Sequence, residues 1–133
     1  MGKNFNVVQC REGWKKLYQP IIDAVINFDI CQSSSDKRIG IKSIHQDDGE
    51  LCIDLVQEEN VTSEIAWKIY DAEQASRRTC EYCGDTKNVG TTMNYHFETC
   101  CKNCWEAHIL PKRPQSIWKD YKTTKMYSFN QKH

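Results

Sequence analysis

Two pairs of cysteines near the C-terminal end constrain the fold of this chain more than any other feature. Each pair, Cys80 with Cys83 and Cys101 with Cys104, has two residues between its cysteines, and seventeen residues separate the pairs. Two intervening residues let a tight turn direct both thiolates at one ion, and roughly 15–20 residues between such pairs are typical of a four-cysteine zinc site. Gly84 supplies backbone freedom where the first turn ends. The sequence therefore predicts one structural Zn²⁺ held by the four thiolates.

Neighbouring residues offer alternative ligands. Cys100 directly precedes Cys101, but only Cys101 keeps the two-residue spacing to the last cysteine of the motif. We therefore expect Cys101 to bind the ion and Cys100 to be a buried neighbour. His96 and His108 lie close in sequence, yet four thiolates already close a tetrahedral shell. Both histidines are expected to lie on the surface or to pack around the site without binding the ion.

The expected metal is zinc, with iron as the rival because rubredoxin-type sites also use two cysteine pairs. Those sites favour Gly or Pro in the second turn, where this chain has Lys102, Asn103 and then Trp105. Four thiolates leave no open position for water or substrate, so the ion is expected to stabilise the fold without taking part in chemistry. We therefore expect a protein that is not an enzyme.

An enzymatic alternative is a nuclease of the His-Asn-His kind, since such enzymes often carry a structural four-cysteine zinc. They need a histidine pair within the finger, and the only histidine between Cys83 and Cys101 is His96. Neither a Ser-His-Asp or Cys-His-Asn arrangement nor a nucleotide-binding fingerprint can be quoted from the sequence. The nuclease reading is disfavoured.

The remaining cysteines and the hydropathy pattern favour a cytoplasmic protein. No stretch approaches the ~18 apolar residues that a membrane span requires, and the first thirty residues lack a signal-peptide pattern. In a reducing compartment, paired cysteines favour metal over disulfides. The isolated Cys10, Cys31 and Cys52 are expected to be small buried hydrophobes.

Hydrophobic periodicity predicts a helix, a β-hairpin and a second helix before the cysteine motif. Apolar residues recur at steps of three and four from Trp14 to Phe28, with the regular helix expected to begin near Pro20. Alternating residues flank the turn signal Asp47-Asp48-Gly49, which predicts a hairpin. Thr62 is expected to cap the second helix, whose buried stripe is Ile65, Ile69, Ala72 and Ser76.

These elements indicate an α+β fold in three parts. Residues 1–78 form a helix, hairpin and helix unit, and residues 79–109 form the four-cysteine zinc finger packed on it. The finger is treble-clef-like if a helix carries the second cysteine pair and a zinc ribbon if it does not; a short helical stretch before Pro111 favours the former. Between the pairs, a short hairpin is expected from Thr91, Thr92, Tyr95 and Phe97. Residues 110–133 form a basic, aromatic tail.

Short motifs occur in a particular order along residues 10–108. They are Gly13-Trp14 opening a helix, Ile44 with Gly49-x-Leu51 in the hairpin, the helix end with Ala72, Glu73 and Ser76, and Thr79-Cys80-Glu81-x-Cys83-Gly84. In this order they resemble a family of small phage and bacterial zinc-finger proteins of unassigned function. That family carries a basic run before Leu51, where this chain has His45, Gln46, Asp47 and Asp48. The resemblance implies the fold, the zinc and a mobile-element origin, but no activity.

Charge is distributed unevenly although basic and acidic residues number 18 each. From Ser43 to Ser76 there are nine acidic residues and one base, Lys68. Together with the closed metal site, this acidic segment leads to the first hypothesis, a zinc-stabilised module that docks on a protein partner and, in a mobile element, inhibits a host factor. The alternative is that the acidic segment is simply a solvated face.

The second hypothesis is a nucleic-acid binder, because zinc fingers often have this role. From Leu110 onward six bases face one acid, and aromatic residues are interleaved with them. The alternative is that the aromatic side chains pack on the domain while the lysines stay in water. The candidate nucleic-acid contacts are Lys112, Arg113, Trp118, Lys119, Tyr121, Lys122 and Lys125.

Overall fold

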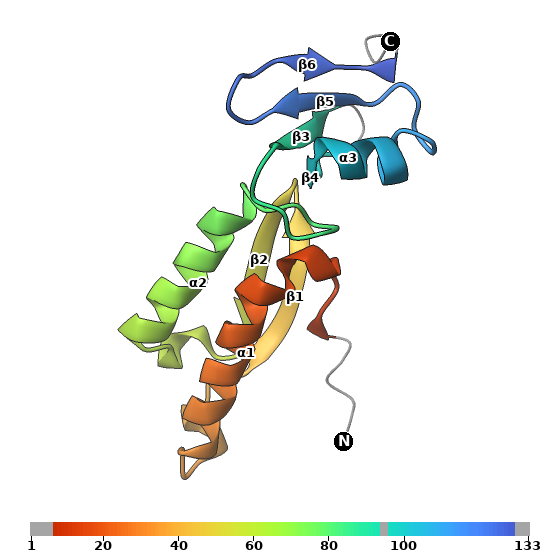
Figure 1. Ribbon diagram of the computed structural model, residues 1–133. Helices are drawn as coiled ribbons and strands as arrows, with labels where there is room; N and C mark the ends of the chain where they lie inside the picture. The colour runs from red at the N-terminus through yellow and green to blue at the C-terminus, as the bar shows by residue number, and fades with distance from the viewer. Residues whose placement is uncertain (1–6, 94–95, 130–133) are drawn as a thin grey trace.

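The computed structural model describes residues 7–93 and 96–129. Within these residues the protein is α+β, with three α-helices and two antiparallel sheets. Figure 1 shows an elongated molecule with two lobes. We call residues 7–78 the helix–hairpin lobe and residues 79–129 the cysteine lobe.

The first α-helix of the helix–hairpin lobe is α1 (Lys15–Ile30). Its buried side chains include Tyr18, Ile21 and Val25, whose spacing of three and four places them on one face. The expectation that the regular helix begins near Pro20 was wrong, because α1 already starts at Lys15 and contains the proline. Pro20 is exposed, so its ring does not disturb the packed stripe. The burial of that stripe outweighs the loss of one backbone hydrogen bond at the proline.

The predicted hairpin is formed by β1 (Ile41–Asp47) and β2 (Glu50–Leu55). Asp47 pairs with Glu50, which leaves Asp48 and Gly49 as a two-residue turn with φ of 53° and 83°. Positive φ at both positions is the requirement of the tight turn that matches the twist of the strands. Ile44 and Leu51 point from the hairpin into the core and are fully buried.

The second helix, α2 (Ser63–Ser76), lies against the edge of β2. Thr62 caps it as predicted, with its side chain accepting a hydrogen bond from the Ile65 amide at 3.2 Å. At the other end of α2, Ser76 Oγ accepts from the Leu51 amide at 2.9 Å and Glu73 Oε2 accepts from the Ile53 amide at 3.0 Å. The helix thereby occupies amide donors that an open strand edge would leave free.

The cysteine lobe is built on a four-stranded sheet in the order β4-β3-β5-β6. Its strands are β3 (Val89–Met93), β4 (Thr99–Cys101), β5 (Ile117–Asp120) and β6 (Met126–Tyr127), and α3 (Lys102–Cys104) continues into a single π-helical turn, Trp105–Ile109. Thr91 and Thr92 lie in β3 as predicted, whereas Phe97 lies outside the strands and is exposed. Tyr95 lies outside the described residues.

The segment set apart as a tail, residues 110–133, contributes β5 and β6 to this sheet. β5 pairs with β3, and Trp118 of β5 is only 2% exposed. Its indole Nε1 donates to the Cys100 carbonyl at 2.9 Å, and its ring stacks on Trp105 with centroids 6.3 Å apart. Gly90 makes room for this packing, because a Cβ there would lie 2.7 Å from the Trp118 ring. The two tryptophans form the core of the cysteine lobe beside the cysteines.

Hydrogen bonds to backbone carbonyls join the two lobes near the start of α1. The Gly13 amide donates to the Glu81 carbonyl at 2.7 Å, and the Trp14 indole donates to the Thr79 carbonyl at 2.8 Å. On the other side of the junction, Thr99 Oγ1 donates to the Gly49 carbonyl at 2.6 Å. The chain around the first cysteine pair is therefore held by the helix–hairpin lobe as well as by its own turn.

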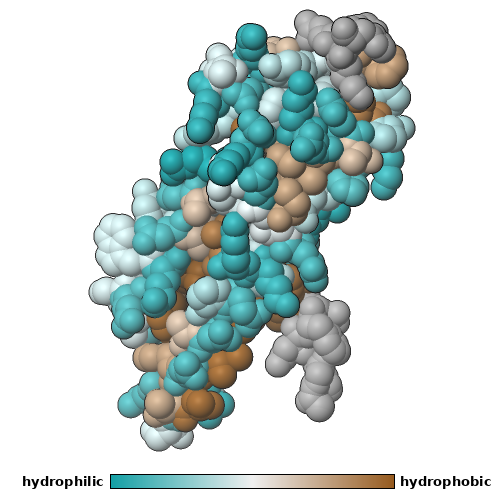
Figure 2. Space-filling view, viewed as in Figure 1, coloured by the Kyte–Doolittle hydropathy of each residue, from teal (hydrophilic) through white to brown (hydrophobic). Residues whose placement is uncertain are grey.

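The surface differs between the lobes on the face shown in Figure 2. On the lower lobe, which contains α1 and α2, hydrophobic side chains are interspersed with hydrophilic ones, and on the upper lobe hydrophilic side chains surround a light-brown, moderately hydrophobic patch. No helix among the described residues is long and apolar enough to cross a membrane.

Candidate metal centre

Four thiols gather where the first turn of the cysteine lobe meets α3. The Sγ atoms of Cys80, Cys83, Cys101 and Cys104 all lie within 4.8 Å of one another. Cys83 Sγ and Cys101 Sγ are 3.8 Å apart. Thiolates bound tetrahedrally at about 2.3 Å from a Zn²⁺ ion would be separated by about 3.8 Å. The donor set and its spacing therefore fit one metal ion, as the sequence predicted.

Two different local structures position the two pairs. Cys80 and Cys83 lie in a tight turn in which the Gly84 amide donates to the Cys80 carbonyl at 3.0 Å. Gly84 has a φ of +81°, a conformation that favours glycine. Cys101 ends β4 and is the N-terminal flanking residue of α3, and Cys104 closes the first turn of that helix.

The local backbone favours the thiolate form of Cys80. Burial would raise the pKa of this thiol, but the backbone amides of Cys83, Cys101 and Tyr82 donate to its sulfur. The amides outweigh burial, and the pKa lies below its ordinary value. A metal ligand must be deprotonated, so these amides favour Cys80 as a ligand. Burial raises the pKa of Cys101 and Cys104, so these two thiols would release their protons as a cation binds.

The other candidate ligands lie outside the cluster. Cys100 is fully buried beside it, and burial raises the pKa of its thiol well above the ordinary range. His96 is exposed, and His108 stacks on the ring of Tyr82 with centroids 4.8 Å apart. The set of four cysteines that the spacing predicted is the set that the fold brings together.

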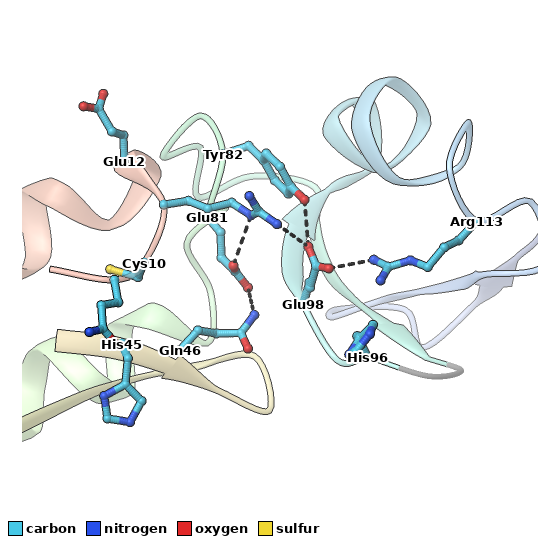
Figure 3. Close-up of a pocket in the computed structure, with 11 residues that line it drawn as sticks. Cys10, Glu12, His45, Gln46, Glu81, Tyr82, His96, Glu98 and Arg113 are labelled. Atoms are coloured by element: carbon cyan, nitrogen blue, oxygen red, sulfur yellow. Dashed lines mark hydrogen bonds and ion pairs between the residues drawn. The ribbon is translucent and has the colours of Figure 1, made fainter. Parts of the chain in front are cut away.

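An open polar cleft of about 1070 Å³ is lined by the segment before α1, the hairpin, the first cysteine turn and the β3–β4 loop (Figure 3). Two buried carboxylates, Glu81 and Glu98, lie on its wall and are 1% and 7% exposed. Arg11 bridges them, with nitrogen atoms 3.8 Å from Glu81 Oε1 and 3.6 Å from Glu98 Oε1. Its guanidinium carbon also lies 4.4 Å from the centroid of the Tyr82 ring.

Glu81 connects the cysteine turn to both neighbouring strands. Its Oε2 accepts from the Thr99 amide at 2.8 Å and from Gln46 Nε2 at 2.9 Å. Burial raises the pKa of Glu81 to about 7, and these hydrogen bonds limit the rise. The residue between the first two cysteines thus belongs to the junction of the lobes.

The negative charge of Glu98 is stabilised more fully by its neighbours than that of Glu81. Burial alone would raise its pKa, but a hydrogen bond from Arg113 at 2.6 Å and one from the Tyr82 hydroxyl at 2.7 Å stabilise the charged form. The pKa of Glu98 therefore lies below its ordinary value. With both oxygens occupied and Arg11 close by, this group is a structural ion-pair centre.

Replacing Arg113 with glutamine tests that conclusion. We expect Arg113→Gln to lower the free energy of unfolding by about 2 kcal/mol, because Glu98 loses a hydrogen bond between charged groups and stays buried. Chemical denaturation of metal-loaded protein measures the change. Lys112→Gln is the control, since this neighbouring base is exposed. Equal stability of the two variants would show that the Arg113 pair contributes nothing.

The seven candidate nucleic-acid contacts separate into different environments. Arg113 is paired with Glu98, and Trp118 is in the core and cannot stack on a base. Lys119 is half-buried in β5. The exposed members of the set are Lys112, Tyr121, Lys122 and Lys125, of which Tyr121 and Lys122 line one common cleft.

Residues outside the motif also contribute to these sites, and sequence reasoning missed them. Arg11 and Glu98 come from segments outside the cysteine motif, and nothing in their local sequence distinguishes them from solvated charges. Arg78 and Lys87 also come from outside the predicted contacts, and they line the same cleft as Tyr121. The one usable signal was Glu81, since an acidic residue inside a metal-binding turn must find a partner if it is buried.

Fold and site together define an α+β protein with a four-cysteine cluster able to hold a metal ion near its C-terminal end. No protein-family model matches the chain, and searches of curated proteins and of solved structures found no match.

Proposed function

We propose that this protein is a non-enzymatic, zinc-stabilised module that binds a protein partner. Zinc is the ion that four thiolates at this spacing suit best, and a closed shell leaves no position at which it could activate water. The second cysteine pair lies at the start of α3, directly after the β3–β4 hairpin. This order supports the treble-clef-like arrangement over the zinc ribbon.

The observation that carries the proposal is an exposed aromatic pair on α2. Trp67 is 64% exposed and Tyr70 is 52% exposed, and their rings meet edge to face with centroids 5.6 Å apart. Tryptophan and tyrosine contribute much of the binding energy in protein interfaces, and their rings lose little conformational freedom on binding. Here the pair lies on the outward face of a helix whose other face is fixed to β2.

The charges around this pair indicate the chemistry of the partner. Glu64 and Asp71 are exposed on the same helix, Glu58 and Glu59 are exposed just before it, and Lys68 is the only base from Ser43 to Ser76. An acidic surface with aromatic anchors complements a basic surface with apolar pockets. In a mobile element, such a module would inhibit a host factor by occupying its basic groove.

Removing the aromatic pair tests the proposed function. We expect Trp67→Ala combined with Tyr70→Ala to weaken partner binding about 30-fold or more, because two interface anchors are lost. Full-length, metal-loaded protein is used for affinity capture from nuclease-treated lysate of its source cells. Calorimetry with the purified partner then gives the dissociation constants of both forms.

A matched double variant controls for the loss of exposed aromatic surface. Phe97→Ala with Tyr121→Ala removes rings that are 45% and 52% exposed on the cysteine lobe. This control should keep the partner. A partner that binds the α2 variant as tightly as the wild type, or that lacks a basic surface, would contradict the proposal.

A further inference from the structure

A second cleft, of about 460 Å³, lies in the cysteine lobe away from the polar cleft of Figure 3. Its walls come from Arg78 just after α2, from the loop before β3 and from the turn after β5. The side chains that matter here are Arg78, Lys87, Tyr121, Lys122 and Asp120.

Tyr121 presents its ring to solvent at the edge of this cleft. The ring is 52% exposed, and the Tyr121 amide donates to the Val89 carbonyl at 2.9 Å, which fixes the backbone beside β3. The guanidinium carbon of Arg78 lies 5.9 Å from the ring centroid. An exposed aromatic ring beside a guanidinium group is a surface on which a flat base can stack.

The cations of the cleft are available to a ligand. Among residues 7–93 and 96–129, Arg78, Lys87 and Lys122 form no ion pair, whereas Arg77 and Arg113 are each paired with a glutamate. The acid that lines the cleft is Asp120, whose Oδ2 already accepts from the amide and hydroxyl of Thr123 at 2.8 and 2.9 Å. With three bases and one acid, the cleft has a net charge of +2.

The basic surface continues beyond the cleft. Lys102 begins α3, and its amide donates to the carbonyl of Asn88 in the cleft wall at 3.2 Å. Its ammonium group lies 4.0 Å from the centroid of the Tyr127 ring on β6. The Tyr127 ring packs against Trp118 and is not open to a base, so Lys102 adds only a further positive charge beyond the cleft. A further charge suits a strand with several phosphates better than a single nucleotide.

We propose that this cleft binds single-stranded nucleic acid, with one base stacked on Tyr121 and the adjoining phosphates held by Arg78, Lys87 and Lys122. This activity is separate from the protein docking proposed for α2. A duplex hides its base faces, so the stacking contact favours a single strand. The tail alone supplies only part of the site, because Arg78 and Lys87 come from outside it and Trp118 is buried.

Fluorescence anisotropy with labelled homopolymer DNA and RNA of about 15 nucleotides tests the proposal on full-length, metal-loaded protein. We expect single strands to bind at about 50 mM salt and to bind roughly 20-fold more weakly at about 200 mM, because contacts to three phosphates release about two counterions. Tyr121→Ala should weaken binding about tenfold by removing one stacked base. Tyr121→Phe should retain binding because the ring remains.

The exposed acidic surface of α2 offers matched controls. Tyr70→Ala removes a ring with the same 52% exposure, and Lys68→Gln removes an exposed base on α2 for comparison with Lys87→Gln. Both controls should bind like the wild type, and Lys87→Gln should reduce the salt dependence. Absence of binding at the lower salt, equal effects of Tyr121→Ala and Tyr70→Ala, or equal affinity for duplex would each overturn the proposal.

Discussion

Changing Cys101 to serine is expected to abolish metal binding and to unfold most of the cysteine lobe. The wild type should contain one zinc per chain, and the variant should contain almost none, because a serine hydroxyl does not replace a thiolate. The lobe should lose order with the metal, since the binding free energy of a structural zinc is part of the folding free energy, of the order of 10 kcal/mol. Elemental analysis and near-ultraviolet circular dichroism measure the two effects.

The neighbouring cysteine provides the matched comparison. Cys100→Ser makes the same chemical change one residue earlier, at a buried thiol outside the cluster. It should retain zinc, although a hydroxyl in an apolar site costs about 1–3 kcal/mol of stability unless it finds a partner. Equal zinc loss in both variants would show that the ligand is misassigned, and iron in the purified wild type would contradict the choice of metal.

The second large effect is expected at the junction between the lobes. Gly13→Ala should lower the free energy of unfolding by about 3 kcal/mol, near the upper end of the usual cost of overpacking. A Cβ at this position would lie 2.2 Å from the Cys80 carbonyl oxygen and 2.4 Å from the Glu81 carbonyl carbon. Both contacts are with the backbone of the first cysteine turn, which the Gly84–Cys80 and Gly13–Glu81 hydrogen bonds hold in place.

Chemical denaturation of the metal-loaded protein measures the change. Glu12→Ala is the control, because it introduces the same residue at an exposed position in the same short 3₁₀ turn, Glu12–Trp14, which precedes α1. The control should differ from the wild type by about 0.5 kcal/mol or less. If Gly13→Ala were as stable as the control, Gly13 would not pack closely against the first cysteine turn in solution.

The features that were predicted correctly depend on residues close in the chain. The cysteine spacing identified the four members of the cluster, Thr62 identified the start of α2, and Asp48-Gly49 identified the turn of the hairpin. In each case the geometry of a few consecutive residues limits the structure. The prediction that the first helix begins near Pro20 failed because it also used only local geometry. Burial of the α1 stripe overrode the local helix-breaking tendency of proline.

The roles of the charged and aromatic residues after Leu110 were decided by tertiary contacts. Arg113, Trp118 and Tyr121 were all candidate nucleic-acid contacts in the sequence. In the structure, Arg113 pairs with Glu98, Trp118 packs against Trp105 and Tyr121 remains exposed. The difference arises because β5 pairs with β3, which turns Trp118 toward the core of the lobe. A spacing rule cannot predict that pairing, because it depends on side chains from several segments that meet only when the chain has folded.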